Sequence, residues 1–143
     1  MKGERFYPIP WDAYSEFGMR RLRMLHGDGP AAFGRWHILL GMLYASDGCI
    51  LADDASTRIV LMSELELDED GLDRFIQALA TVGFIDGAAY EARGSIVSPG
   101  VVKQLEYIDS KRRAAAAGGR AKAAAAKARK GAKNGADELC TDA

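Results

Sequence analysis

Hydrophobic positions in the middle of the chain recur at steps of three and four residues, and they give its clearest structural prediction. The stripe consists of Leu72, Phe75, Ile76, Leu79 and Val82, which is the spacing of one buried helical face. Asp68 suits the N-cap of this helix, and Gly83 suits its end. A shorter apolar run precedes it at residues 59–65. The pattern therefore predicts a short helix, a tight turn at residues 67–68 and a longer helix.

The segment after this helix changes to an extended pattern. Phe84 and Ile85 begin it, Gly87 makes a turn, residues 93–94 make a second bend, and residues 96–97 return. This order predicts a β-hairpin. A helix-turn-helix followed by a hairpin is the outline of a winged helix. The expected fold class is therefore mainly α with a small β-wing, and the pattern indicates a binding module rather than an enzyme.

The N-terminal part is expected to add a strap and a first helix. Residues 6–11 are aromatic and rich in proline, so we expect an extended strap that covers part of the core. Residues 15–25 follow as a helix, whose inward positions are Met19, Leu22 and Leu25. Arg20, Arg21 and Arg23 cannot share one face of this helix, so at least one of them is expected to pair with a carboxylate.

A second helix is predicted over residues 30–46, with Pro30 in its first turn. Its inner stripe consists of Phe33, Trp36, Leu39, Leu40 and Leu43. Asp47 and Gly48 then form a turn signal, and residues 49–51 are expected to form a short strand. These elements lead into the helix-turn-helix described above.

The C-terminal part begins as an amphipathic helix and then loses its apolar face. Ser98 and Pro99 are a typical helix start. The stripe expected to pack on the core consists of Val101, Val102, Leu105 and Ile108. Residues 111–135 are almost entirely Ala, Gly, Lys and Arg, and Gly118 and Gly119 interrupt them. We therefore expect a winged-helix domain over residues 1–110 and a basic tail over residues 111–143, helical to about Ala117 and disordered beyond it.

The net charge of −1 conceals a strong asymmetry. Residues 1–110 carry 10 Lys or Arg against 17 Asp or Glu, a net charge of −7. Residues 111–143 carry 9 against 3, a net charge of +6. A basic arm on an acidic body is expected either to bind a polyanion or to fold back on its own body.

Candidate nucleic-acid-binding residues lie in two places. On the longer helix, Arg74 and Gln77 are of types that bind guanine and adenine edges in the major groove. Nearby carboxylates would repel phosphates, so a helix built for protein contact is the alternative. The remaining candidates are Arg93, Lys111, Arg112, Arg113, Arg120, Lys122, Lys127, Arg129, Lys130 and Lys133. If the nine tail residues all contacted duplex DNA, a plot of log affinity against log salt concentration would have a slope of roughly −8. The alternative is that the tail only improves solubility or serves as a linker.

The sequence gives little evidence for a metal site, a catalytic site or a phosphate-binding loop. His26 and His37 have no partners at metal-ligand spacing, no serine has a visible base, and no glycine loop has the features of a phosphate-binding motif. No catalytic residue, metal site or cofactor is therefore expected. The N-terminus has no apolar signal-peptide core, and the apolar run at residues 38–45 is too short to span a membrane. With only two distant cysteines, Cys49 and Cys140, a cytoplasmic protein is expected.

One run of the chain resembles a known family. The matching residues are Leu22, Arg23, His26, Gly27, Gly34, Trp36, Leu39, Leu40, Leu43 and Tyr44. They are similar to an L-R-x-x-H-G element and a following G-x-x-W-x-x-L-L-x-x-L-Y helix in the replisome-organiser, or DnaD-like, N-terminal domains of phage and prophage replication proteins. The likeness covers about residues 6–120. It departs from the family at Pro30–Phe33, in place of a tyrosine-rich segment, and in lacking a second DnaD-like domain.

The resemblance implies a winged-helix protein of phage or prophage DNA replication initiation, and the charge pattern suggests that its basic arm binds DNA. Replication proteins such as a helicase or its loader are the implied partners. The alternative is an interaction module that docks on replication proteins or self-associates, without reading bases. A transcriptional regulator is a further alternative, but it needs a basic recognition helix that this sequence lacks.

Overall fold

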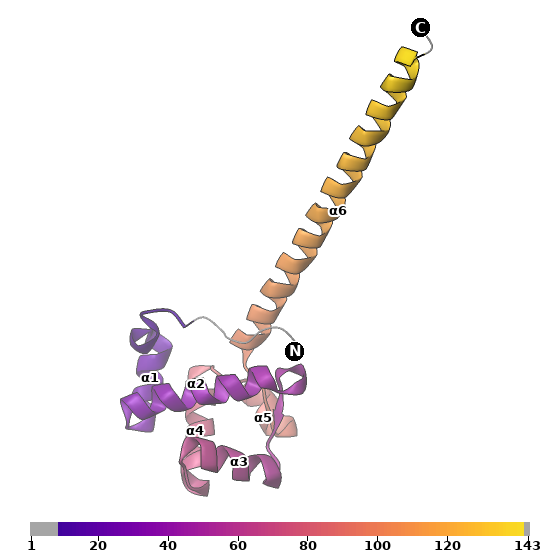
Figure 1. Cartoon of the computed structure of the whole chain (residues 1–143). Helices are drawn as coiled ribbons and strands as arrows, with labels where there is room; N and C mark the ends of the chain where they lie inside the picture. Colours follow the sequence, from indigo (N-terminus) through magenta and orange to yellow (C-terminus); the bar gives the residue numbers. More distant parts are fainter. Residues whose placement is uncertain (1–8, 142–143) are drawn as a thin grey trace. The chain divides into compact units, whose positions relative to one another are not determined.

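The computed structural model describes the backbone of residues 9–141 and the side chains of residues 9–131. The chain divides into two compact units, Met1–Lys103 and Gln104–Ala143. The fold is mainly helical with one small antiparallel sheet (Figure 1). Its elements in chain order are η1 (Ala13–Ser15), α1 (Phe17–His26), α2 (Gly29–Ala45), η2 (Asp47–Cys49), β1 (Leu51–Ala52), α3 (Ala55–Leu65), α4 (Glu69–Val82), α5 (Gly87–Arg93), β2 (Ser95–Ile96) and α6 (Pro99–Thr141).

Aspartates begin four of the helices in the first unit. Each accepts a hydrogen bond from the backbone N–H three residues further on, which satisfies a donor that the helix leaves free. The four capping residues are Asp28 on α2, Asp54 on α3, Asp68 on α4 and Asp86 on α5. A part of the acidic charge of this unit is therefore fixed at helix N-termini, where the helix dipole favours it.

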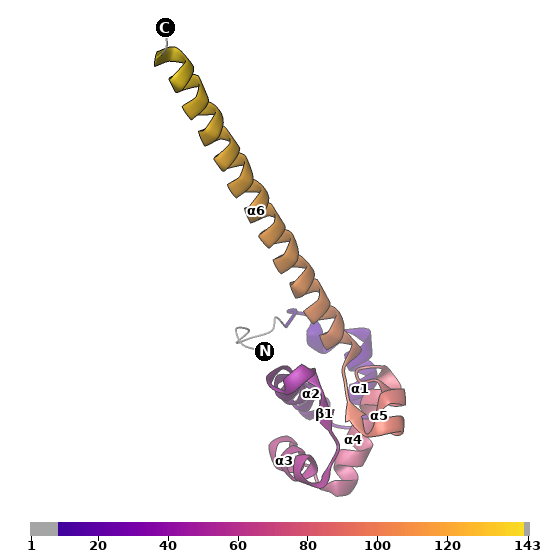
Figure 2. The same ribbon diagram turned by 90° about the vertical axis from the view of Figure 1, so that its right-hand side faces the viewer.

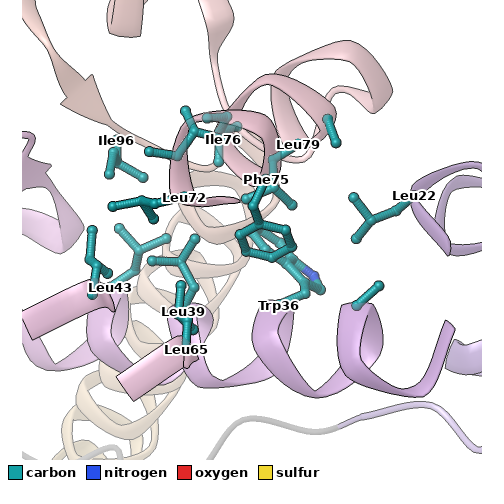
Figure 3. Close-up of a cluster of buried hydrophobic side chains, with 14 of the residues drawn as sticks. Leu22, Trp36, Leu39, Leu43, Leu65, Leu72, Phe75, Ile76, Leu79 and Ile96 are labelled. Carbon is teal, nitrogen blue, oxygen red and sulfur yellow. The ribbon is translucent and has the colours of Figure 1, made fainter. Parts of the chain in front are cut away.

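The core confirms the predicted helical stripes. In α4, Leu72, Phe75, Ile76 and Leu79 are all buried. They point toward buried side chains of α2, and the cluster is completed from α1, α3 and β2 (Figure 3). Those partners include Trp36, Leu39, Leu43, Leu22, Leu65 and Ile96. The predicted order of short helix, tight turn and longer helix is also confirmed by α3 and α4, with Glu66 in a left-handed conformation at φ 53° between them.

The predicted β-hairpin after α4 is wrong. Residues 87–93 form the helix α5 instead, and β2 pairs with β1 rather than with residues 84–85. Leu51 lies opposite Ile96 in the antiparallel register, and Figure 2 shows β1 between α2 and α3. The reason is local: Asp86 caps the segment through the Ala89 N–H at 3.1 Å, and its alanines favour helix over strand. One strand-like bond remains, from the Asp86 N–H to the Val97 carbonyl at 2.8 Å.

The N-terminal predictions are confirmed only in part. In α1, Met19 and Leu22 are buried as predicted, but Leu25 is exposed. Residues 6–8 of the expected strap lie outside the described residues, while Ile9 and Trp11 are exposed. The described part of the strap therefore leaves its apolar side chains in solvent rather than covering the core.

The last helix differs from the prediction in its length. It continues to Thr141, past Ala117 where the sequence analysis expects helical structure to end. Of its predicted apolar stripe only Val101 is buried, while Val102 is exposed. From Asp109 to Gly131 every side chain is exposed, so this stretch is held by local helix propensity, which is high for Ala, Lys and Arg.

Candidate nucleic-acid interface

The predicted base-reading residues lie on the outer surface of α4. Arg74 and Gln77 are both exposed and stand three residues apart, so they share one face of the helix. The Thr81 hydroxyl lies further along this face and donates to the Gln77 carbonyl at 2.8 Å. The helix therefore presents a guanidinium and an amide to solvent, as the sequence analysis predicts.

An ion-pair network neutralises one of the carboxylates on α4. Arg58 of α3 donates to Asp73 at 2.6 Å and to the two carboxylate oxygens of Asp53 at 3.0 and 3.2 Å. The hydrogen bond to Asp73, and then that to Asp53, raise the pKa of Arg58 above its usual value. Glu69 lies at the edge of the network, with its Oε1 4.0 Å from the Arg58 Nε. The repulsion that the sequence predicts at this end of α4 is therefore weaker than the count of carboxylates suggests.

The network extends to α5 through Tyr90, whose hydroxyl donates to Asp53. Burial, reinforced by the Asp53 carboxylate, raises the pKa of Tyr90 to about 12. Because Asp53 follows β1, this cluster ties α3, α4, α5 and the strand together. Sequence reasoning missed Arg58, since its partners stand five and fifteen residues away and no local pattern joins them.

A second arginine fixes the turn between α3 and α4. Arg35 of α2 donates to the Leu65 carbonyl at 2.7 Å and to the Glu66 carbonyl at 3.3 Å, which satisfies carbonyls that α3 leaves free at its end. Its other terminal nitrogen lies 2.6 Å from the His26 Nε2. Burial, the Arg35 charge and, more weakly, the Arg74 charge lower the pKa of His26, against an opposing effect of Asp28. His26 is thus neutral and accepts the hydrogen bond from Arg35, with its ring next to Phe75 of α4.

Arg93, the candidate at the predicted wing, lies elsewhere. It is exposed in the last turn of α5, followed by Gly94, whose carbonyl accepts from the Asp53 N–H at 2.7 Å. Among the described residues, no hydrogen bond or ion pair joins it to Arg74 or Gln77. Because α5 replaces the predicted hairpin, Arg93 stands at the end of a helix and not on a wing.

The basic residues of the tail lie on α6, in the second unit. Those whose side chains are described are all exposed: Lys111, Arg112, Arg113, Arg120, Lys122, Lys127, Arg129 and Lys130. The side chain of the ninth candidate, Lys133, lies outside the described residues. Arg113 is 3.3 Å from Asp109, while Lys111 lies 4.9 Å from the centre of the Tyr107 ring, whose hydroxyl raises its pKa.

Helical geometry gathers these eight side chains on one side of α6. At about 100° per residue, they fall within an arc of about 200°, from Lys111 and Arg129 at one edge to Arg113 at the other. The opposite side carries alanine and glycine. No acidic residue lies between Lys111 and Gly131. The tail therefore presents a basic face made of three groups, at residues 111–113, 120–122 and 127–130. The sequence analysis did not predict this face because it expected disorder beyond about Ala117.

Other chemical sites are not evident in the described part of the chain. No group of three or more His, Cys, Asp or Glu residues there could hold a metal ion. No helix within the same residues is long and apolar enough to cross a membrane. Searches of protein-family models, of curated proteins and of solved structures return no match for this chain.

Proposed function

We propose that this chain is a DNA-associated protein that binds nucleic acid mainly through the basic face of α6. The observation that carries the proposal is the arc of eight exposed Lys and Arg side chains, uninterrupted by acidic residues. Contacts with phosphates release counterions and supply most of the sequence-independent affinity of DNA-binding proteins. A face of this composition is suited to that role.

The dimensions of the basic face also fit a nucleic acid. From Lys111 to Lys130 the helix rises about 28 Å at 1.5 Å per residue. A duplex advances about 3.4 Å per base pair, so this length corresponds to about eight base pairs. The side chains can therefore contact several successive phosphates while the alanine side of α6 faces away.

The first unit is proposed to be a winged helix-turn-helix in which α4 adds a secondary contact. Exposed Arg74 and Gln77, together with the pairing of Asp73 by Arg58, support this role. The net charge of −7 on residues 1–110 opposes it, because a field of that sign repels phosphates. Arg74 and Gln77 are therefore assigned to specificity rather than to the main affinity.

The biological setting that we propose is cytoplasmic, in phage or prophage DNA replication, with replication proteins such as a helicase or its loader as partners. The support is the resemblance described above, several of whose residues pack in the core, among them Trp36, Leu39 and Leu43. An interaction module is the second candidate. Ile59 and Val60 on α3 favour it, because both are exposed and apolar on a helix that also carries the carboxylate of Glu64.

Titration with labelled DNA tests the proposal. Fluorescence anisotropy would be measured for the whole chain and for a chain ending at Ser110, each with single- and double-stranded DNA. The whole chain should bind both, and the shortened chain should lose most of its affinity for double-stranded DNA. If neither chain binds any DNA, the interaction module becomes the preferred function. If the shortened chain binds double-stranded DNA as tightly as the whole one, the role assigned to α6 is wrong.

A further inference from the structure

The outward face of α1 and the segment before it expose unusual side chains. Trp11 is 97% exposed, Phe17 is 77% exposed and Met24 is 84% exposed. Arg20 and Arg21 are also exposed on this helix. Aromatic side chains are usually buried because water disfavours their surface. An exposed phenylalanine ring among exposed arginines on α1, with an exposed tryptophan on the preceding segment, therefore marks this region as a binding surface.

The arginines of α1 are not neutralised by carboxylates, contrary to the prediction that at least one would be. Among the described residues, none of Arg20, Arg21 and Arg23 forms an ion pair. Arg23 instead lies over the Tyr14 ring at 4.0 Å, and Arg21 lies 6.0 Å from the centre of the Phe17 ring. These positive charges therefore remain available to an anion.

The nearby acidic groups do not cancel this charge. Asp28 accepts from the Ala31 N–H at 3.3 Å as the cap of α2. Asp12 and Glu16 are exposed, and neither forms an ion pair with a described residue. Since α1 itself contains no acidic residue, its outward face is a basic patch on a unit that is acidic as a whole.

A hollow opens beside two of the arginines of α1. Its volume is about 410 Å³, and its lining residues are Arg20, Arg23, Met24, Gly27 and Gly29. Arg23 also has a buried Nε that lacks a hydrogen-bond partner in the described part of the chain. A buried hydrogen-bond donor without an acceptor costs folding free energy. Arg23 is one of the residues at the edge of the open hollow.

We propose that this face of α1, with Trp11, is a second binding site whose ligand is single-stranded DNA. The arginines would contact phosphates, while the Trp11 and Phe17 rings would stack on bases. A duplex hides the faces of its bases inside the stack, whereas a single strand exposes them, so the two rings select the single strand. The choice of DNA rests on the proposed function; the site itself is carried by unit one and does not depend on α6.

The fluorescence of Trp11 provides a direct test in the full chain. Trp36, the other tryptophan, is buried in the core, so quenching by added DNA reports on Trp11. A thymidine oligonucleotide should quench the emission, and a matched duplex should leave it nearly unchanged. The Trp11→Phe variant should lose the quenching while still binding the oligonucleotide, because phenylalanine also stacks. Absence of quenching at oligonucleotide concentrations where anisotropy shows binding would overturn the proposal.

Two variants test the face by affinity. Phe17→Ala and the double variant Arg20→Ala/Arg21→Ala should each weaken oligonucleotide binding about tenfold, with duplex affinity within about twofold of the original. Ile59→Ala and Lys103→Ala are matched controls, because they remove an exposed apolar residue and an exposed basic residue from other elements. Both controls should bind like the original chain.

The outcomes separate this site from the proposed role of α6. Neutralising the basic residues of α6 should reduce duplex binding yet leave the Trp11 quenching at saturating oligonucleotide intact. Intact quenching in this variant would support the α1 site, whether or not the duplex binding falls. If the Phe17 and arginine variants bound the oligonucleotide normally but changed the sedimentation mass of the protein, the face would serve a second copy of the chain, and the proposal would be wrong.

Discussion

The guanidinium of Arg58 meets the carboxylate of Asp73 at 2.6 Å, joining α3 to α4 across the turn of the helix pair. The same guanidinium binds Asp53, which is almost wholly buried. One side chain therefore holds two elements together, and its single positive charge, shared between Asp53 and Asp73, offsets part of the negative charge on the surface of α4. This contact is therefore expected to stabilise the helix pair.

Arg58→Ala should destabilise the fold by about 2 kcal/mol, because it leaves the Asp53 carboxylate, whose side chain is 8% exposed, without its main partner. Asp73→Ala should cost less than about 1 kcal/mol, since Asp73 is exposed and Arg58 keeps Asp53. Urea unfolding of both variants measures the difference. Equal losses of unfolding free energy in the two variants would show that the buried Asp53 carboxylate does not determine the strength of the network.

Phe75→Ala should reduce the free energy of unfolding by roughly 3–5 kcal/mol, because Phe75 is fully buried at the centre of the core. Phe17→Ala is the matched control: the same atoms are removed from an exposed position, and the loss should stay below about 1 kcal/mol. Thermal or urea denaturation distinguishes them. A Phe75 variant as stable as the control would contradict the packing of α4.

Stability should fall as the pH drops below the usual histidine pKa of 6.5. Burial and the Arg35 charge lower the pKa of folded His26, so the unfolded chain binds a proton first. Below about pH 6.5 this binding favours unfolding, and the loss grows until the lowered pKa of the folded state is passed. Urea midpoints at several pH values measure the slope.

His26→Gln should flatten this dependence on pH, because glutamine accepts the Arg35 hydrogen bond without titrating. Some dependence should remain, since burial also lowers the pKa of His37. If the His26→Gln variant kept the full dependence of stability on pH, the contact between His26 and Arg35 would not contribute to that dependence.

Replacing Gly118 and Gly119 with alanine should increase the helicity of α6. Glycine costs about 1 kcal/mol relative to alanine in a helix, and no atom lies near the positions that the new methyl groups would take. Circular dichroism of the full chain measures the gain. Placing glycine at Ala124 and Ala125 should have the opposite effect, and a signal unchanged in both variants would show that α6 is not limited by local propensity.

The sequence predicted elements that depend on local interactions more accurately than elements that depend on contacts between distant residues. The stripe of Leu72, Phe75 and Leu79 is local, so its periodicity was enough to place α4 and the core. The segment after Ile85 was misjudged because its Asp86 cap was not recognised and its glycines were taken as the turns of a hairpin. Strand pairing between Leu51 and Ile96 joins residues far apart in the sequence, and no local pattern encodes it.

The candidate interface was predictable in part for the same reason. Exposure of Arg74 and Gln77 followed directly from the helix that carries them. The contacts of Arg35 with Leu65 and His26 join three helices, so they emerge only in the folded chain. The basic side of α6 was within reach of the sequence, but only once the tail was treated as one continuous helix.

The salt dependence of duplex binding tests the central claim most directly. With eight basic side chains of α6 contacting phosphates, log affinity against log salt should have a slope of about −7 for the full chain. A variant that replaces Arg120, Lys122, Lys127, Arg129 and Lys130 with glutamine should show a slope of about −3 and much weaker binding. Arg74→Ala should leave the slope nearly unchanged. If the five-site variant kept the affinity and slope of the original chain while Arg74→Ala lost them, DNA binding would belong to α4, and the account of α6 would be contradicted.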